Sequence, residues 1–232
     1  MSTMGDALDS LTPIGRSDTL AQKVRTQMKE AVMSGRFAPG EKLTIRSIAS
    51  ALKVSLTPAR EALYYLASEG VLEMRPNGSV YVPELTVERM VELTKIRVAL
   101  ESTASREAVR RITDAEIAQI AALNDAIIAK HDQKDFSAMM ALNWQFHFAL
   151  YRASQMDLLV RMIESCWLMT GSYLNVIYPK FGEISDGISN HLQIVRALER
   201  RDADRVAAAI TTDINLAADA LIGAIKHANE GR

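Results

Sequence analysis

Hydroxyl side chains and arginines gather between residues 46 and 60 in a pattern that could hold nucleic acid. Arg46 opens one short helical segment, and a tight turn leads to a second segment that opens with Ser55, Thr57 and Arg60. An arginine can bridge the edge of a guanine or pair with phosphate, and hydroxyl and N–H groups at a helix start also hold phosphate. Two short helices joined in this way can lay the second one in the DNA major groove. We therefore predict that these four side chains contact DNA.

A second set of candidate DNA contacts lies in residues 71–83, where the spacing of apolar residues becomes alternating. Residues 71–75 and 79–82 are predicted to form two short strands, joined by a turn at 76–78. The Asn-Gly pair in this turn favours a hairpin because both residues tolerate positive φ. Such a hairpin is marginal alone and must pack on the preceding helices. The residues that could reach the minor groove or its phosphates are Arg75, Asn77 and Gly78.

Side chains that could bind a metal ion are spread over the second half of the chain. Asn143 and His147 are four residues apart and share one face of a helix. His191 and Asp213 lie on later helices. Oxygen and imidazole ligands from several helices of a bundle can converge on one ion. A single histidine is more often a hydrogen-bonded structural residue, so the spacing alone leaves both interpretations open.

The helices that must position these side chains follow from apolar residues at three- and four-residue spacing. The first begins near Thr19 and is stopped by Gly35, and the helix that starts at Ser55 or Thr57 ends at Gly70. After Pro83 the pattern is helical and contains no strand. Helices are predicted over residues 87–111, 114–130, 136–154, 158–174 and 188–228, the last divided near 202–204.

These elements predict a mainly α protein with two domains. Residues 1–17 are expected to form a flexible tail, and residues 18–84 a winged helix-turn-helix with a two-stranded wing. Residues 85–232 are expected to form an all-helical bundle of about six or seven helices.

The composition limits the class of protein without deciding it. The 232 residues carry a net charge of −1, which excludes a protein that is basic throughout, but residues 18–84 hold nine basic and seven acidic side chains. The one cysteine, Cys166, cannot form an internal disulfide, so we expect the protein to be in a reducing compartment. We expect the side chain of Cys166 to be buried as a small apolar residue. No secretory signal and no apolar run near the ~20 residues of a membrane span are visible. A soluble, cytoplasmic protein without a membrane partner is expected.

The predicted DNA-binding segment contains a specific series of short motifs. They are Pro39-Gly40, Leu43, Ile48-Ala49, Val54-Ser55-Leu56-Thr57-Pro58-Ala59-Arg60-Glu61-Ala62-Leu63, Leu66, Glu69-Gly70 and Arg75-Pro76-Asn77-Gly78. In these motifs the chain resembles the GntR family of bacterial transcription regulators over residues 20–83. The resemblance implies DNA contacts at Arg46, Ser55, Thr57 and Arg60. Leu56 departs from the family, which usually has a DNA-contacting arginine there, so the sequence preference or affinity is expected to differ.

The helical segment carries a second series of motifs. They are Glu92, Arg97-Val-Ala-Leu-Glu101, Phe146-His147, and His191 followed by residues 197–203. This segment resembles the FCD domain of the FadR subfamily, in which an aspartate and three histidines often hold a divalent ion beneath an effector. Here Asn143 stands in the place of the aspartate and Asp213 in that of the last histidine, while His147 and His191 match. The resemblance implies one zinc, manganese or nickel ion; because an Asn oxygen is a weaker ligand, a metal-free polar pocket is the alternative.

The resemblance also implies a small organic acid as effector. Arg97 could grip its carboxylate bidentately from the bundle interior, or could instead form a surface pair with Glu101. The predicted effector-binding residues are Arg97, Asn143, His147, Tyr173 and His191, with Asn175 and Tyr178 as further candidates.

These expectations describe a homodimeric transcription regulator, most simply a repressor, whose hold on operator DNA depends on a small carboxylate. The alternative is a helical metalloenzyme that acts on small carboxylates, with the N-terminal unit as a partner-binding module. No nucleophile–base constellation and no glycine-rich phosphate loop supports the enzyme. A DNA-binding architectural protein without a ligand would instead have an apolar bundle centre.

Overall fold

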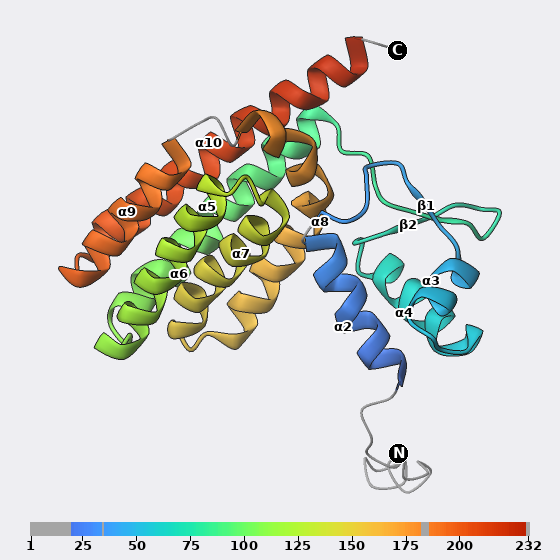
Figure 1. Cartoon of the computed structure of the whole chain (residues 1–232), viewed down its shortest axis with the longest axis horizontal. Coiled ribbons are helices and arrows are strands. Elements are labelled where there is room, and N and C mark those ends of the chain that lie inside the picture. The colour runs from blue at the N-terminus through green and yellow to red at the C-terminus, as the bar shows by residue number, and fades with distance from the viewer. Residues whose placement is uncertain (1–19, 34, 182–185, 231–232) are drawn as a thin grey trace, which may run out of the picture.

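The N-terminal domain is built on three helices. A computed structural model describes residues 20–33, 35–181 and 186–230, so the predicted tail at 1–17 lies outside the described residues. The helices are α2 (Leu20–Met33), α3 (Ile45–Ala51) and α4 (Leu56–Ser68) (Figure 1). Their apolar faces share one core, in which Leu63 and Leu66 of α4 are fully buried.

Helices α3 and α4 form the helix-turn-helix. Thr44 caps α3, because its side chain accepts the backbone N–H of Ser47 and the Ser47 hydroxyl accepts the backbone N–H of Thr44. The turn passes through Lys53 at a positive φ of 53°. Ser55 is the N-cap of α4, as the start signals predicted, although its hydroxyl makes no capping hydrogen bond.

The wing has one more strand than the two predicted. Its antiparallel strands are β1 (Lys42–Leu43), β2 (Glu73–Met74) and β3 (Val80–Tyr81), in the order β1-β3-β2. The sequence missed β1 because two residues are too few to show a period. Gly78 has a positive φ of 76°, whereas Asn77 is not among the positive-φ residues and instead accepts the backbone N–H of Ser79 with its side chain. The predicted hairpin is present, with positive φ at Gly78 and not at Asn77.

The second domain consists of six helices within the described residues, inside the predicted range. They are α5 (Val87–Val109), α6 (Asp114–Asp132), α7 (Phe136–Ala153), α8 (Asp157–Phe181), α9 (Asp186–Glu199) and α10 (Ala203–Glu230). Thr86 caps α5, and Thr113 forms a capping box with Glu116 at the start of α6. The mainly α fold is confirmed, with the winged domain at one side of the bundle and α9 at the other (Figure 1).

Helix α10 is long and apolar enough, by length and composition, to qualify as a membrane span over Ala203–His227. In the structure it packs against α5 and α9. Val206, Ile210 and Leu221 are almost completely buried there. One face of α10 therefore belongs to the core of the bundle, while 28% of its apolar window is buried in all.

The two domains touch through α2 and α8. Leu168 of α8 is buried in the core of the N-terminal domain. One turn later, Gly171 approaches the end of α2 so closely that an added Cβ would lie 2.6 Å from the carbonyl oxygen of Val32. The linker is also attached to α8, because the backbone N–H of Leu85 donates to the hydroxyl of Tyr173 at 2.5 Å. Helix α8 therefore contacts both the DNA-binding domain and the linker.

Candidate ligand site and DNA-binding surface

His147, His191 and Asp213 come together inside the bundle. They project from α7, α9 and α10, and their candidate ligand atoms lie within 4.8 Å of one another. Nε2 of His147 lies 3.2 Å from Oδ2 of Asp213, and Nε2 of His191 lies 3.6 Å from Oδ1. Both imidazoles are buried, and Asp213 is half-buried. The structure thus brings together three of the four predicted metal ligands.

The surroundings of these three residues favour the forms that bind cations. Burial alone would raise the pKa of Asp213, but His147, His191 and the amide of Asn190 together lower that pKa below its ordinary value. Burial lowers the pKa of His191 to about 4, against a smaller opposing effect of Asp213. At neutral pH the carboxylate is ionised and His191 is neutral, which are the states that metal binding requires.

The hydrogen bonds behind His147 concern which of its nitrogens carries the proton. The hydroxyl of Tyr151 donates to Oε2 of Glu101 at 2.5 Å, because a carboxylate can only accept. Towards Nδ1 of His147, 3.3 Å away, the same hydroxyl oxygen can then only accept. With the proton on Nδ1 this contact is a hydrogen bond, and Nε2 then presents a lone pair towards Asp213; with the proton on Nε2 the ring faces the carboxylate as a donor.

This arrangement places a buried acceptor beside a carboxylate. Nε2 of His147 lies 3.2 Å from Oδ2 of Asp213, and in the tautomer with the proton on Nδ1 this contact joins two acceptors. Two acceptors at this distance repel unless a proton or another cation lies between them. A divalent ion would satisfy both, so the residues present fit a metal ion.

Two asparagines lie near the site in different roles. Asn143 is half-buried one turn before His147 on α7, and its part in a metal site stays a prediction. Asn190 was not selected from the sequence. Its Nδ2 donates to Oδ1 of Asp213 at 3.2 Å and to the backbone carbonyl of Ala209 at 2.9 Å. Asn190 therefore orients the carboxylate, and its position next to His191 was the only signal for it.

Arg97 lies in the interior, but its charge is already neutralised. Its Nε donates to Oε1 of Glu101 at 2.6 Å, and Glu101 is completely buried. The guanidinium also lies 4.8 Å from the ring centre of Trp167. The predicted interior position of Arg97 agrees with the structure, and the alternative of a pair with Glu101 is also present, but this pair is buried and not at the surface. Because Nε and Nη2 of Arg97 face Glu101, a second carboxylate would have to bind through Nη1 and the remaining Nη2 hydrogen.

Tyr173 lies at the domain linker, where its hydroxyl accepts the backbone N–H of Leu85. Its ring belongs to a small apolar cluster that includes Met90, Met140 and Leu221. This position suits a link between α8 and the linker. The side chains of Asn175 and Tyr178 lie outside the part of the chain that the structure describes.

The predicted helix-turn-helix contacts are exposed at the starts of α3 and α4. Arg46 is the second residue of α3; Ser55, Thr57 and Arg60 occupy the N-cap and first turns of α4. The opposite face of α4 is fixed to the core through buried residues such as Leu63. The first turns of α4 therefore present their polar side chains to solvent.

The wing candidates are also exposed, although one of them has partners within the wing. Arg75 stacks over the ring of Tyr81 at 3.8 Å, and its Nε lies 3.6 Å from a carboxylate oxygen of Glu73. Asn77 and Gly78 form the exposed turn. The contacts of Arg75 hold it along the sheet and offset part of its charge.

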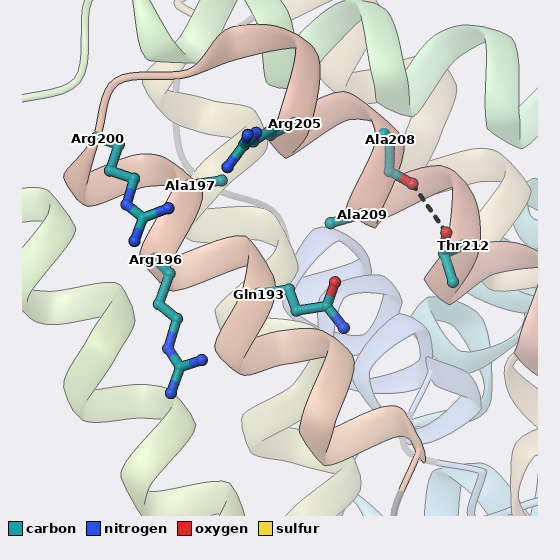
Figure 2. A pocket seen from close by; sticks show the side chains of 8 residues that line it. All are labelled: Gln193, Arg196, Ala197, Arg200, Arg205, Ala208, Ala209 and Thr212. Carbon is teal, nitrogen blue, oxygen red and sulfur yellow. Dashed lines mark hydrogen bonds between the residues drawn. The ribbon is translucent and has the colours of Figure 1, made fainter.

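A separate groove of about 390 Å³ lies between α9 and α10 (Figure 2). Its rim carries Arg196, Arg200 and Arg205, and Ala197 and Ala209 line it between them. The three arginines are exposed, and Nε of Arg205 lies 3.2 Å from Oδ2 of Asp202. Exposed arginines along an open groove are typical of a solvated helix face, so the groove carries no functional assignment.

Comparison with known proteins decides the family. Residues 20–82 match the bacterial regulatory proteins of the gntR family, and residues 92–216 match the FCD domain. The chain belongs to the GntR family. It is therefore a DNA-binding transcription regulator with an FCD ligand-binding domain.

Relatives of this GntR-family regulator carry matching names. It is similar to the HTH-type transcriptional regulator McbR of Escherichia coli, with 29% identity over 188 residues, covering 80% of this chain and 85% of McbR. The solved structure of E. coli McbR/YncC superposes with a TM-score of 0.81 at 27% identity and covers 85% of this chain and 94% of that one. The "Probable D-xylose utilization operon transcriptional repressor" of Paenarthrobacter nicotinovorans is 28% identical over 216 residues, or 92% of each chain. Both domain families are those of transcription regulators, and these relatives are named as regulators. The comparisons therefore do not support the alternative that the chain is a metalloenzyme.

Proposed function

We propose that this regulator is a repressor whose hold on operator DNA is controlled by a divalent ion and a small organic anion in the FCD domain. The observation that carries the proposal is the convergence of His147, His191 and Asp213, whose candidate ligand atoms lie within 4.8 Å of one another inside the bundle. A divalent ion would be held by the carboxylate and the two imidazoles, and a bound cation in turn attracts an anion.

The donor set defines the kind of ion. Two imidazoles and one carboxylate suit zinc, manganese or nickel, and three protein ligands leave positions on the ion for water or a ligand carboxylate. Glu101 and Tyr151 support His147 from behind, and Asn190 supports Asp213. Such supporting hydrogen bonds orient metal ligands and raise their affinity.

Helix α8 offers a route from this site to the DNA-binding domain. The ring of Trp167 on α8 lies 5.2 Å from the ring of His147, centre to centre. The next residue, Leu168, is buried in the core of the DNA-binding domain, and Gly171 lies against the end of α2. A ligand that binds two positions of α8 with different affinity would therefore shift the DNA-binding domain.

Binding to DNA would use α4 in the major groove, with Arg46 and the wing on flanking phosphates. We propose that two copies act as a homodimer in the cytoplasm, because operators for such proteins are two-fold symmetric. The relatives' regulatory roles support this assignment.

The test is the effect of metal and acid on DNA affinity. Chelator-treated protein is titrated into labelled DNA selected from a random pool, with and without manganese or zinc and a panel of small carboxylates. We expect one combination to change the affinity at least about tenfold, within the usual range of allosteric coupling. His147→Ala should abolish this change, and His131→Ala, which alters a histidine of α6 outside the site, should retain it. An equal response in His147→Ala would refute the proposal.

A further inference from the structure

Leu56 is an apolar side chain in a place where packing does not require one. It is the first residue of α4 and is 46% exposed. Its neighbours Ser55 and Thr57 are exposed as well. Leu56 does not belong to any of the hydrophobic clusters formed by the described residues. The core therefore gives no reason for a leucine here.

The position of Leu56 follows from how α4 is attached to its domain. Ala59 and Leu63 are completely buried and fix one face of α4 against the core. Leu56 and Arg60 are four residues apart, so their side chains are neighbours on the helix, and both are exposed at the edge of this buried face. In a helix-turn-helix the N-terminal residues of the second helix meet the base edges. Leu56 and Arg60 would then meet neighbouring positions of the same DNA half-site.

The chemistry of a leucine restricts what it can recognise in a groove. It cannot donate to a phosphate or to a base, so its gain comes from burying apolar surface. In the major groove, thymine presents an apolar group, its C5-methyl, while the other base edges present polar donors and acceptors. A leucine placed against guanine or cytosine would remove water from these polar atoms without replacing the hydrogen bonds.

We propose that Leu56 recognises the methyl group of a thymine in each operator half-site, beside the position that Arg60 contacts. This inference rests on the proposal that α4 is the helix in the major groove. The proposal assigns part of the sequence specificity for DNA to Leu56. It predicts a thymine at the base pair that Leu56 contacts, whereas an arginine in place of Leu56 would select a base with hydrogen-bond acceptors.

The experiment removes one methyl group at a time from the DNA. A binding site is selected from random-sequence DNA with the wild-type protein, and each thymine of a half-site is then replaced by uracil, which lacks only the methyl. Affinities are measured by fluorescence anisotropy for wild type, Leu56→Ala, Arg60→Ala and Leu158→Ala. Leu158 is 67% exposed on α8 and provides the matched leucine control.

We expect one thymine whose replacement weakens binding of the wild type and of Leu158→Ala about fivefold, the effect of burying one methyl-sized apolar group. In Leu56→Ala the same replacement should have no effect, while in Arg60→Ala it should persist. If every uracil effect is retained in Leu56→Ala, or if none occurs in the wild type, the inference is wrong. Equal affinities of all four proteins for the selected site would instead contradict the assignment of α4 as the reading helix.

Discussion

The close approach of α8 to α2 predicts a specific effect of Gly171→Ala. A Cβ at this position would lie 2.6 Å from the carbonyl oxygen of Val32 and 2.9 Å from the Cα of Met33. Ordinary van der Waals contacts begin at 3.4 Å, so the two helices must separate by roughly 0.8 Å along the shorter contact. The obstacle is helix backbone and cannot turn aside as a side chain could.

The expected cost can be separated from the general effect of alanine in a helix. Overpacking of a well-packed contact costs about 1–3 kcal/mol. Alanine by itself stabilises a helix interior by about 1 kcal/mol relative to glycine. Gly223 on α10 is a matched control, because an added Cβ there meets nothing within 4 Å. Gly171→Ala should therefore unfold with a free energy about 1–3 kcal/mol below that of Gly223→Ala.

Urea denaturation of both variants measures this difference, and hydrogen exchange at the end of α2 locates it. Faster exchange near Val32 in Gly171→Ala alone would show that the contact between the domains has loosened. If the two variants are equally stable and the end of α2 exchanges as in the wild type, the role given to α8 as a contact between the domains is refuted.

Three further predictions concern single side chains. Arg60→Ala should weaken DNA binding by about 1–3 kcal/mol while leaving the unfolding free energy unchanged, because Arg60 is exposed; gel shifts at several salt concentrations test this, and an unaltered affinity would exclude Arg60 from the interface. Glu101→Gln leaves Arg97 buried without its charge partner and should lower the unfolding free energy by about 3–5 kcal/mol. The double variant Arg97→Met with Glu101→Leu should recover much of this loss. A Glu101→Gln variant as stable as the wild type in urea denaturation would contradict the importance of this pair. Burial lowers the pKa of His191 to about 4, so between about pH 6.5 and 4 only the unfolded chain gains a proton at this residue. Metal-free protein should therefore lose up to roughly 3 kcal/mol of unfolding free energy as the pH falls through this range. His191→Asn should flatten this pH dependence in urea titrations, and an unchanged profile would show that His191 is not the cause.

The sequence predicted the local elements where their signals are local. Helix starts predicted at Ser55 or Thr57 and at residue 114 are marked by hydroxyl residues, and the structure places N-caps at Ser55 and Thr113. Strand β1 was not predictable, because its pairing with β3 depends on how residues far apart in the chain meet in the wing. Helix α8 runs to Phe181, beyond the predicted end at residue 174.

The candidate site was only partly predictable for a different reason. His147, His191 and Asp213 were identified by resemblance, but their approach depends on the packing of α7, α9 and α10. The hydrogen bond between Tyr151 and Glu101 joins residues 50 positions apart, and no sequence spacing marks it. Arg97 was predicted to face the interior, but its burial with Glu101 follows from the packing of α5 within the bundle.

The most direct test of the central claim is the metal content of the purified protein. Chelator-treated wild type is equilibrated with zinc or manganese, freed of unbound metal, and measured by mass spectrometry of the element. We predict one ion per chain in the wild type and in His131→Ala, and none in His147→Ala or Asp213→Ala. A wild type that retains no metal, or a His147→Ala variant that retains as much as the wild type, would contradict the claim that the buried histidines and Asp213 form a metal site.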